Sequence, residues 1–327
     1  MDIVQVENVS KKYKVKEQSG SAIKQFFFPK YKEFTAVNNL SFKVEEGDIR
    51  GFIGPNGAGK STTIKMLVGI LAPSSGSIKI NGFDPYKERI DNAKQIGVVF
   101  GQRTQLWWDI PVIETFKLLR SMYRISESDY NKRIRMFSDI LDLGDFINKP
   151  TRQLSLGQRM RADFGAALLH SPKVVFLDEP TIGLDVIAKE KIRDFIKTIN
   201  SELGTTIILT THDTTDIDFL CRNITVIDKG AIIYEGILDN LKKTYESSAK
   251  VTVCSSKESL RKIKENLENV DITYENENTI RIVYNPKKVD KSIILQEIMK
   301  CKDIFDIKIE QDSLENIIKN IYTGEKG

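Results

Sequence analysis

Apolar and polar residues alternate near the N-terminus, over roughly residues 3–15 and 36–50. This two-residue period predicts β-strands. Residues 16–34 interrupt the alternation and look inserted. A short apolar run, 49–54, then leads through a glycine-rich turn into the helical stretch STTIKMLVGIL. A strand, a glycine loop and a helix in this order predict the opening of an α/β unit.

The hydrophobic period changes twice further along the chain. Between residues 112 and 169 apolar positions recur every three or four residues, which predicts helices. After residue 172 the near-continuous apolar runs VVFLD and TIILT alternate with helical patterns. Such runs are typical of a parallel sheet that is covered on both faces.

The pattern changes again from about residue 250. Short strands and two amphipathic helices follow in the order β-α-β-β-α-β, which is the ferredoxin-like order. The sequence therefore predicts an α/β nucleotide-binding domain, with a mixed sheet, an antiparallel β subdomain and a helical subdomain, followed by a small α+β domain. We place these domains at residues 1–236 and 250–327, the helical subdomain at about 103–169 and a linker at 237–249.

Composition excludes several classes of protein. With 49 basic and 45 acidic residues among 327, the net charge of +4 gives no reason to expect a nucleic-acid partner. The three cysteines are scattered, and the two histidines are too few for a histidine metal centre. No apolar run approaches the roughly 20 residues that span a bilayer. The N-terminus lacks a signal-peptide pattern, so we expect a cytoplasmic protein.

The strongest chemical motif is 54-GPNGAGKST-62, which fits G-x-x-x-x-G-K-[ST] between a predicted strand and helix. Glycines leave the backbone N–H groups free to converge on phosphate oxygens at a helix N-terminus. Lys60 would reach the β- and γ-phosphates, and Ser61 would offer its hydroxyl to Mg²⁺. The predicted ATP-binding residues here are Gly54, Pro55, Asn56, Gly57, Ala58, Gly59, Lys60, Ser61 and Thr62.

Two apolar strands end in residues suited to hydrolysis. In 174-VVFLDEP-180, Asp178 would hold Mg²⁺ and Glu179 would act as general base on the attacking water. In 209-LTTHD-213, His212 could reach a γ-phosphate. Lone acids or histidines at strand ends are commonly structural, but their company with a phosphate loop favours catalysis.

A fourth motif, 154-LSLGQRM-160, is a polar turn that opens a helix. Ser155 and Gly157 would expose backbone donors at that helix N-terminus and so form a second anion site. The motif alone does not say which phosphate would bind there.

These four motifs, in this order over about residues 3–236, resemble the ATP-binding subunits of ABC transporters. Asp185 in TIGLD matches the D-loop of that family. The resemblance implies an ATP-dependent, head-to-tail dimer, here a homodimer, with two ATP at the interface. It also implies that the signature residues Ser155, Leu156, Gly157 and Gln158 cap the ATP of the partner subunit. One departure is Leu156, which replaces the first glycine of LSGGQ.

The resemblance implies two further contacts. An aromatic residue stacks on adenine in this family, and Tyr13 matches best, with Tyr31 and Phe34 as alternatives. Gln102 takes the Q-loop position, where its amide would contact Mg²⁺ or the attacking water, with Gln105 as the alternative. The tryptophans that follow in 101-GQRTQLWWDIP-111 lie where a membrane permease subunit docks in the family.

The motif wording resembles a subgroup of bacterial exporter ATPases that includes a viologen exporter. The resemblance implies an ATPase that energises export through separate permease subunits on the inner face of the membrane. Alternatives are a polysaccharide or ion exporter ATPase, or a soluble ABC ATPase of translation or DNA repair. The soluble types carry a second cassette, coiled coils or zinc modules, and this sequence shows none of these. The C-terminal domain could dimerise, regulate or merely stabilise.

Overall fold

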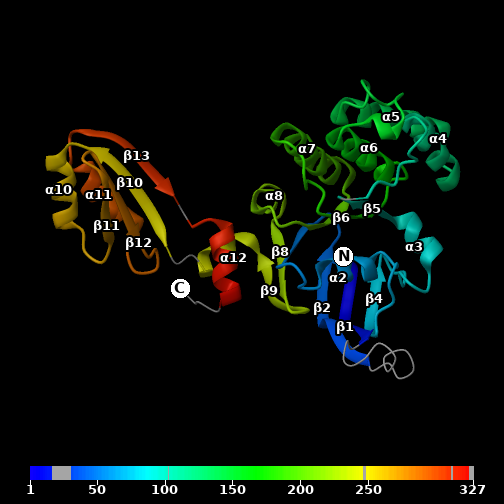
Figure 1. Ribbon diagram of the computed structural model, residues 1–327, viewed down its shortest axis with the longest axis horizontal. Helices are drawn as coiled ribbons and strands as arrows, with labels where there is room; N and C mark the ends of the chain where they lie inside the picture. Colours follow the sequence, from blue (N-terminus) through cyan, green and yellow to red (C-terminus); the bar gives the residue numbers. More distant parts are fainter. Residues whose placement is uncertain (17–30, 102, 246–247, 311, 324–327) are drawn as a thin grey trace, which may run out of the picture. The chain divides into compact units, whose positions relative to one another are not determined.

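A computed structural model describes residues 1–16, 31–101, 103–245, 248–310 and 312–323. The chain divides into two compact units, residues 1–237 and 238–327. We describe each unit by itself (Figure 1). Among the described residues, no helix has the length and apolar character needed to cross a membrane.

A six-stranded mixed sheet forms the centre of the first unit. Its strand order is β5 (Ile96–Phe100), β6 (Val174–Asp178), β7 (Thr206–Thr210), β3 (Ile49–Ile53), β8 (Asn223–Asp228) and β9 (Ala231–Ile237). The first five strands are parallel, and β9 pairs antiparallel with β8. Strands β3 and β7 are buried along their whole length. The near-continuous apolar run of β7 predicts this, whereas β3 also buries Arg50, which is paired with Asp48 and Glu235.

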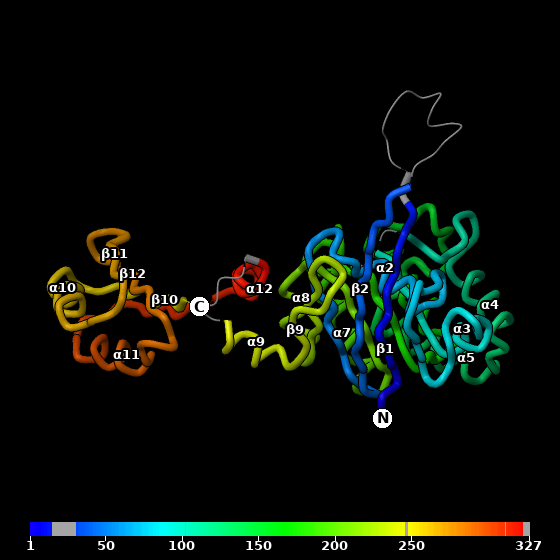
Figure 2. Tube along the Cα trace, turned by 90° about the horizontal axis from the view of Figure 1, so that it is seen from below, coloured from blue at the N-terminus to red at the C-terminus, as the bar shows by residue number. Residues whose placement is uncertain are grey.

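An antiparallel sheet packs beside this one, in the order β2 (Tyr31–Glu45), β1 (Asp2–Lys16) and β4 (Ser75–Ile80). Strands β1 and β2 run side by side over their full length (Figure 2). The interruption expected at residues 16–34 is wrong at both ends, because β1 reaches Lys16 and β2 begins at Tyr31. The outermost cross-strand pairs include Lys14 with Glu33. Because these residues are polar, the alternation of apolar positions does not predict this part of the hairpin. Residues 17–30 of the predicted insert lie outside the described residues.

The core between these two sheets also fixes the first helix of the unit. Phe42 of the antiparallel sheet meets Phe52 of the mixed sheet, with ring centroids 5.5 Å apart. Helix α2 (Lys60–Leu67) buries Ile64 and Leu67 completely in the same cluster. The glycine-rich turn before α2 is therefore held between β3 and a helix that cannot move without opening the core.

The remaining helices of the first unit are α3 (Arg89–Gln95), α4 (Val112–Tyr123), α5 (Glu127–Leu141), the 3₁₀ turn η1 (Thr151–Gln153), α6 (Leu156–Leu168), α7 (Val186–Leu203) and α8 (Thr214–Leu220). Helices α4, α5 and α6 gather at one end of the unit, in the segment predicted as a helical subdomain (Figure 1). Phe195 of α7 contacts Phe137 of α5 and Phe164 of α6 edge-on, with ring centroids 5.8 and 5.9 Å away. These buried rings join the helical subdomain to α7.

The second unit contains a four-stranded antiparallel sheet in the order β11 (Asp271–Asn276), β12 (Thr279–Tyr284), β10 (Ala249–Ser255) and β13 (Ile304–Glu310). The helices of this unit are α9 (Leu238–Tyr245), α10 (Lys257–Asn266), α11 (Lys291–Met299) and α12 (Leu314–Thr323). The chain order and the sheet order together are those of a ferredoxin-like domain, so the predicted fold class is confirmed. Much of the expected linker 237–249 is helix α9, which buries Leu238 and Leu241. These two leucines fold the segment as a helix because they give it one apolar side.

Candidate ATP site

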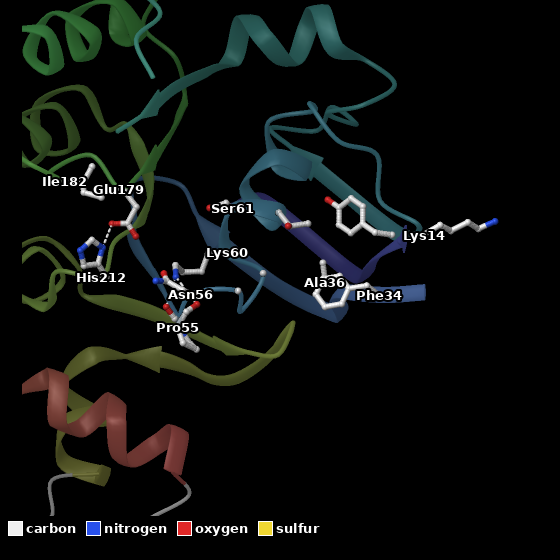
Figure 3. A pocket seen from close by; sticks show the side chains of 15 residues that line it. Lys14, Phe34, Ala36, Pro55, Asn56, Lys60, Ser61, Glu179, Ile182 and His212 are labelled. Atoms are coloured by element: carbon white, nitrogen blue, oxygen red, sulfur yellow. Dashed lines mark hydrogen bonds and ion pairs between the residues drawn. The ribbon is translucent and has the colours of Figure 1, made fainter. Parts of the chain in front are cut away.

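The glycine-rich turn between β3 and α2 forms the floor of an open cavity of about 1120 Å³ (Figure 3). Gly59 precedes α2 with φ +104°, and a Cβ there would lie 2.5 Å from the backbone oxygen of Ala36. Only glycine fits such a position. The cavity is lined by Tyr13, Lys14, Phe34, Ala36, Gly54, Pro55, Asn56, Gly57, Gly59, Lys60, Ser61, Thr62, Glu179, Ile182 and His212. Of the predicted phosphate loop, Ala58 alone is not part of the lining; its side chain is buried.

The ammonium group of Lys60 lies over this loop. Its Nζ donates to the backbone oxygens of Gly54 and Pro55, at 2.6 and 3.2 Å. Burial lowers the pKa of Lys60, and the carboxylates of Glu179 and Asp178 oppose that shift. The cavity floor thus carries a buried cation beside the exposed hydroxyl of Ser61, at a helix N-terminus that favours anions.

Two adjacent carboxylates lie at the end of β6: Asp178 is its last residue and Glu179 follows it. Asp178 accepts a hydrogen bond from the Thr210 hydroxyl at 2.5 Å. The backbone N–H of Glu179 donates to the backbone carbonyl oxygen of Thr210 at 2.9 Å. Glu179 has φ +54°, a left-handed conformation that costs a non-glycine residue about 1–3 kcal/mol. This conformation turns its side chain into the cavity, where Oε2 lies 2.7 Å from Nδ1 of His212 (Figure 3).

A buried carboxylate that the sequence did not reveal supports this pair from behind. Asp216 is 0 % exposed and is bound by the Nε of Arg193 at 2.6 Å. It also accepts hydrogen bonds from the hydroxyls of Thr181 and Thr211. These threonines stand two residues after Glu179 and one before His212, so Asp216 anchors both segments. Its only sequence signal is an acid in the first turn of a helix, which is common.

Two of the three aromatic residues considered for the adenine contact lie at the cavity. Tyr13 and Phe34 are directly opposite on the β1–β2 hairpin, and both line the cavity. Tyr31 is not among the described residues of the lining. The ammonium of Lys11 lies 5.4 Å from the centroid of the Tyr13 ring, a cation–π contact that holds the ring in place.

The signature turn lies outside this cavity. Ser155 caps helix α6 in a reciprocal capping box, in which its hydroxyl accepts from the N–H of Gln158 and the Gln158 side chain accepts from the N–H of Ser155. Leu156 reaches over Gly183 of the TIGLD turn, 3.1 Å from where a Cβ would stand. The leucine that replaces glycine in the motif therefore packs against the loop before Asp185.

Asp185 itself caps helix α7 by accepting a hydrogen bond from the N–H of Ala188 at 2.8 Å. The start of α6 is close to it, since a Cβ on Gly157 would lie 3.3 Å from the Cβ of Ala188. The described residues that line the cavity include neither residues 155–158 nor Asp185. The structure thus brings the signature turn and the D-loop together, and neither lines the cavity that contains the phosphate loop of the same chain.

The segment after β5 holds the two glutamines proposed for the Q-loop. Gln102 lies outside the described residues. Gln105 is turned toward α6, where its Nε2 donates to the backbone oxygen of Asp163 at 2.9 Å. Trp107 and Trp108 are 44 % and 50 % exposed, whereas Leu106 beside them is 5 % exposed. Leu106 therefore fixes the loop to the core, and both tryptophan rings keep a free surface.

A magnesium ion would find only part of its ligands in the described chain. Within residues 1–16, 31–101, 103–245, 248–310 and 312–323, no group of three His, Cys, Asp or Glu side chains could hold a metal. The Ser61 hydroxyl and the Asp178 carboxylate are hard oxygen donors. They suit Mg²⁺, which commonly takes one or two protein ligands and completes its shell with phosphates and water.

One large cavity contains the phosphate loop, the buried Lys60 and Glu179, and Asp178 precedes Glu179 at the end of β6. These features define a P-loop nucleotide-binding ATPase. Comparison with known proteins gives the family. Residues 37–182 match the family model described as ABC transporter. The chain is 33 % identical over 221 residues to the ABC transporter ATP-binding protein NatA of Bacillus subtilis, covering 68 % of this chain and 88 % of that protein. The protein therefore belongs to the ATP-binding proteins of ABC transporters, and the predicted ATP-hydrolysing subunit is confirmed.

Two further similarities bear on the second unit and on assembly. The linearmycin resistance ATP-binding protein LnrL of Bacillus subtilis is 28 % identical over 296 residues, covering 89 % of this chain and 94 % of that protein. The dimeric ATP-binding cassette MJ0796 in a post-hydrolysis state with ADP and phosphate is a structural neighbour, with 28 % identity and TM-score 0.61. That match covers 72 % of this chain and 98 % of the cassette. Relatives of these kinds agree with the prediction of an ATPase that energises export.

Proposed function

We propose that two copies of this chain form an ATP-dependent, head-to-tail dimer that drives export through separate permease subunits. One observation supports this most directly. The phosphate loop, Glu179 and His212 share one cavity, while the signature turn and Asp185 share another surface of the same unit. In this proposal, an ATP molecule bound in one copy meets the signature turn of a second copy. The dimeric neighbour MJ0796 agrees with such an assembly.

The reaction assigned to this cavity is transfer of the γ-phosphoryl group of ATP to water. The loop N–H groups and Lys60 hold the phosphates, and Glu179 accepts a proton from the attacking water. The bond to the β–γ bridging oxygen breaks, which leaves ADP and inorganic phosphate. Held by Ser61 and Asp178, Mg²⁺ would offset the negative charge of the phosphates. Gln102 takes the Q-loop role in this proposal, and Gln105 does not, because it is bonded to α6.

His212 is proposed to position Glu179 and to contact the γ-phosphate. Its ring lies at the cavity edge, and its bond to Glu179 fixes the carboxylate near the loop (Figure 3). Tyr13 is the proposed adenine contact, with Phe34 opposite it as the alternative. Across the dimer interface, Ser155, Leu156, Gly157 and Gln158 would approach the same ATP from the partner copy.

The export role rests on the motif wording, on the resistance protein LnrL among the relatives and on the exposed tryptophans. Trp107 and Trp108 would meet a permease subunit at the inner face of the membrane, which makes the protein peripheral there. Within the exporters, we propose the subgroup that includes a viologen exporter. Residues 250–327 are proposed as an accessory domain, and no nucleic-acid partner is expected from the balanced charge.

Co-purification tests this proposal against the soluble alternative. The wild-type chain, expressed in its own cells and extracted in mild detergent, is expected to bring down hydrophobic membrane subunits in an ATP-responsive complex. The Trp107→Ala and Trp108→Ala double variant is expected to lose them. Recovery of ribosomes or DNA, with no membrane partner, would overturn the transport role while leaving the ATPase assignment intact.

A further inference from the structure

The loop 103–111, between β5 and α4, is hydrogen-bonded to two different parts of the first unit, the mixed sheet and helix α6. At its start, the N–H of Arg103 donates to the backbone oxygen of Phe100 at 2.9 Å, which ties it to the mixed sheet. From Thr104 to Ile110, the hydrogen bonds from the loop to other elements that carry the argument go to α6 and to the turn before it, and Pro111 then joins α4. The attachment changes from sheet to helix between Arg103 and Thr104.

Asp163 of α6 makes the first of these anchors. Its carboxylate is nearly buried, at 4 % exposure, and its Oδ1 accepts from the Thr104 hydroxyl and from the N–H of Gln105, both at 2.9 Å. The Gln105 amide returns a bond to the backbone oxygen of Asp163. Burial raises the pKa of Asp163 to about 6, and the hydrogen bonds from the loop oppose that shift. A buried carboxylate is costly unless it is bonded, so the loop donors and this acid depend on one another.

The other anchors lie close to the signature turn. The N–H of Arg152 donates to the Trp108 oxygen at 3.0 Å, and the N–H of Thr151 donates to the Ile110 oxygen at 3.3 Å. On α6, the guanidinium of Arg159 lies 5.7 Å from the Trp108 ring centroid. Loop, η1 and the first turns of α6 therefore form one connected body with the signature turn.

We propose that Asp163 is a positioning residue that locks loop 103–111 to α6, so that the loop and the signature turn move together. Asp163 is eight residues beyond Ser155, about 12 Å along the helix. A load on the exposed tryptophans thus reaches the signature turn through a rigid helix. The inference rests on the proposed function in two respects: a permease subunit docks on the tryptophans, and the signature turn engages ATP bound by a second copy.

Dimerisation in a Glu179→Gln background tests this role, because that variant is expected to bind ATP without hydrolysing it. Asp163→Ala removes the acceptor and should weaken ATP-dependent dimerisation about tenfold, as expected for lost hydrogen bonds to a charged group. ATP affinity of the monomer should not change, since the phosphate loop lies in another part of the unit. This separation of ATP affinity from dimerisation distinguishes positioning from general damage to the fold.

Three further variants sharpen the test. Asp163→Asn retains Oδ1 as an acceptor and should restore dimerisation. Thr104→Val removes one donor with little change of shape and should weaken dimerisation by less. Because Thr104 and Asp163 share one hydrogen bond, adding Thr104→Val to Asp163→Ala should cause less than the sum of the two single losses. The bond from the Leu106 N–H to the Thr104 hydroxyl, 3.1 Å long, is the only part of the Thr104 loss that should remain.

Arg133→Met provides the matched control. It removes the bond from Nη1 of Arg133 to the Leu169 oxygen, 2.6 Å long, at the opposite end of α6. It should leave dimerisation unchanged. If Asp163→Ala dimerises as tightly as its parent, or if Arg133→Met is equally defective, the positioning role is overturned. If the Glu179→Gln parent binds ATP and stays monomeric, the proposed dimer fails and takes this role with it.

Discussion

The imidazole Nδ1 of His212 lies 2.7 Å from Oε2 of Glu179, within one cavity that also contains the phosphate loop. The two residues follow neighbouring parallel strands, β6 and β7, whose carboxyl ends meet at the same edge of the sheet. The contact holds one carboxylate oxygen and leaves the other free for water. This geometry is the observation on which the proposed role of Glu179 as a base rests.

Glu179→Gln should remove the ability to accept a proton from water, while it keeps the size of the side chain and its hydrogen bond to His212. Turnover should fall by about 10²–10⁴-fold, the range for a lost general base, with ATP affinity retained. Steady-state phosphate release and nucleotide binding measure the two effects. Glu190→Gln, the same change on the exposed surface of α7, is the control and should leave turnover unchanged. Wild-type turnover in Glu179→Gln would contradict the assignment.

Tyr13 and Phe34 make competing predictions for nucleotide affinity. If Tyr13 stacks on adenine, Tyr13→Leu should weaken ATP binding about two- to tenfold, equivalent to about 0.5–1.5 kcal/mol, and Phe34→Leu should have little effect. Fluorescent-nucleotide titration of both variants measures the difference. Inorganic triphosphate, which has no base, should bind both variants equally. A loss confined to Phe34→Leu would transfer the contact to that residue.

The local motifs were predictable because each lies within a few consecutive residues. The loop 54–62, the pair after β6 and His212 all fall where the sequence placed them. Asp163 and Asp216 were not predictable, since their partners come from other segments: Thr104 is 59 residues from Asp163, and Thr181 is 35 residues from Asp216. A single acid on a helix carries no sign of such a partner until the helices are packed.

The same reasoning explains the errors at element boundaries. The hairpin extends to Tyr31 through cross-strand pairs that each include a charged residue, such as Lys14 with Glu33, and an apolar period cannot detect them. Helix α9 escaped notice because its two buried leucines lie among eight residues that otherwise resemble a polar linker. Tertiary contacts decided both segments.

His170 should make the first unit less stable in mild acid. Its Nε2–H donates to the Ile96 oxygen at 2.9 Å, its ring stacks on Tyr123 at 4.0 Å, and burial lowers its pKa to about 4. Below the usual pKa of 6.5, the unfolded chain takes up a proton that the folded chain excludes. The stability contributed by neutral His170 is therefore complete above pH 6.5 and is lost as the pH falls toward 4.

From these values, His170 alone should make the unit about 2 kcal/mol less stable at pH 5 than at pH 7.5. His170→Gln keeps the donor and cannot be protonated, so its stability should depend less on pH by that amount. Urea unfolding followed by tryptophan fluorescence reports on this unit, because both tryptophans lie in it. His212→Gln separates the contribution of the only other histidine. An unaltered pH dependence in His170→Gln would refute the prediction.

Replacing both Trp107 and Trp108 by alanine should separate ATP chemistry from transport. The rings are about half exposed, and Leu106 anchors the loop in their absence, so the variant should fold and bind ATP normally. Loss of two large aromatic side chains at an interface should weaken permease binding at least tenfold, because such residues dominate binding energy. Co-purification with the permease and transport in vesicles measure this. Ile90→Ala, at an exposed apolar residue on α3, is the control and should transport normally. Normal transport by the double variant would contradict a contact between these rings and a permease subunit.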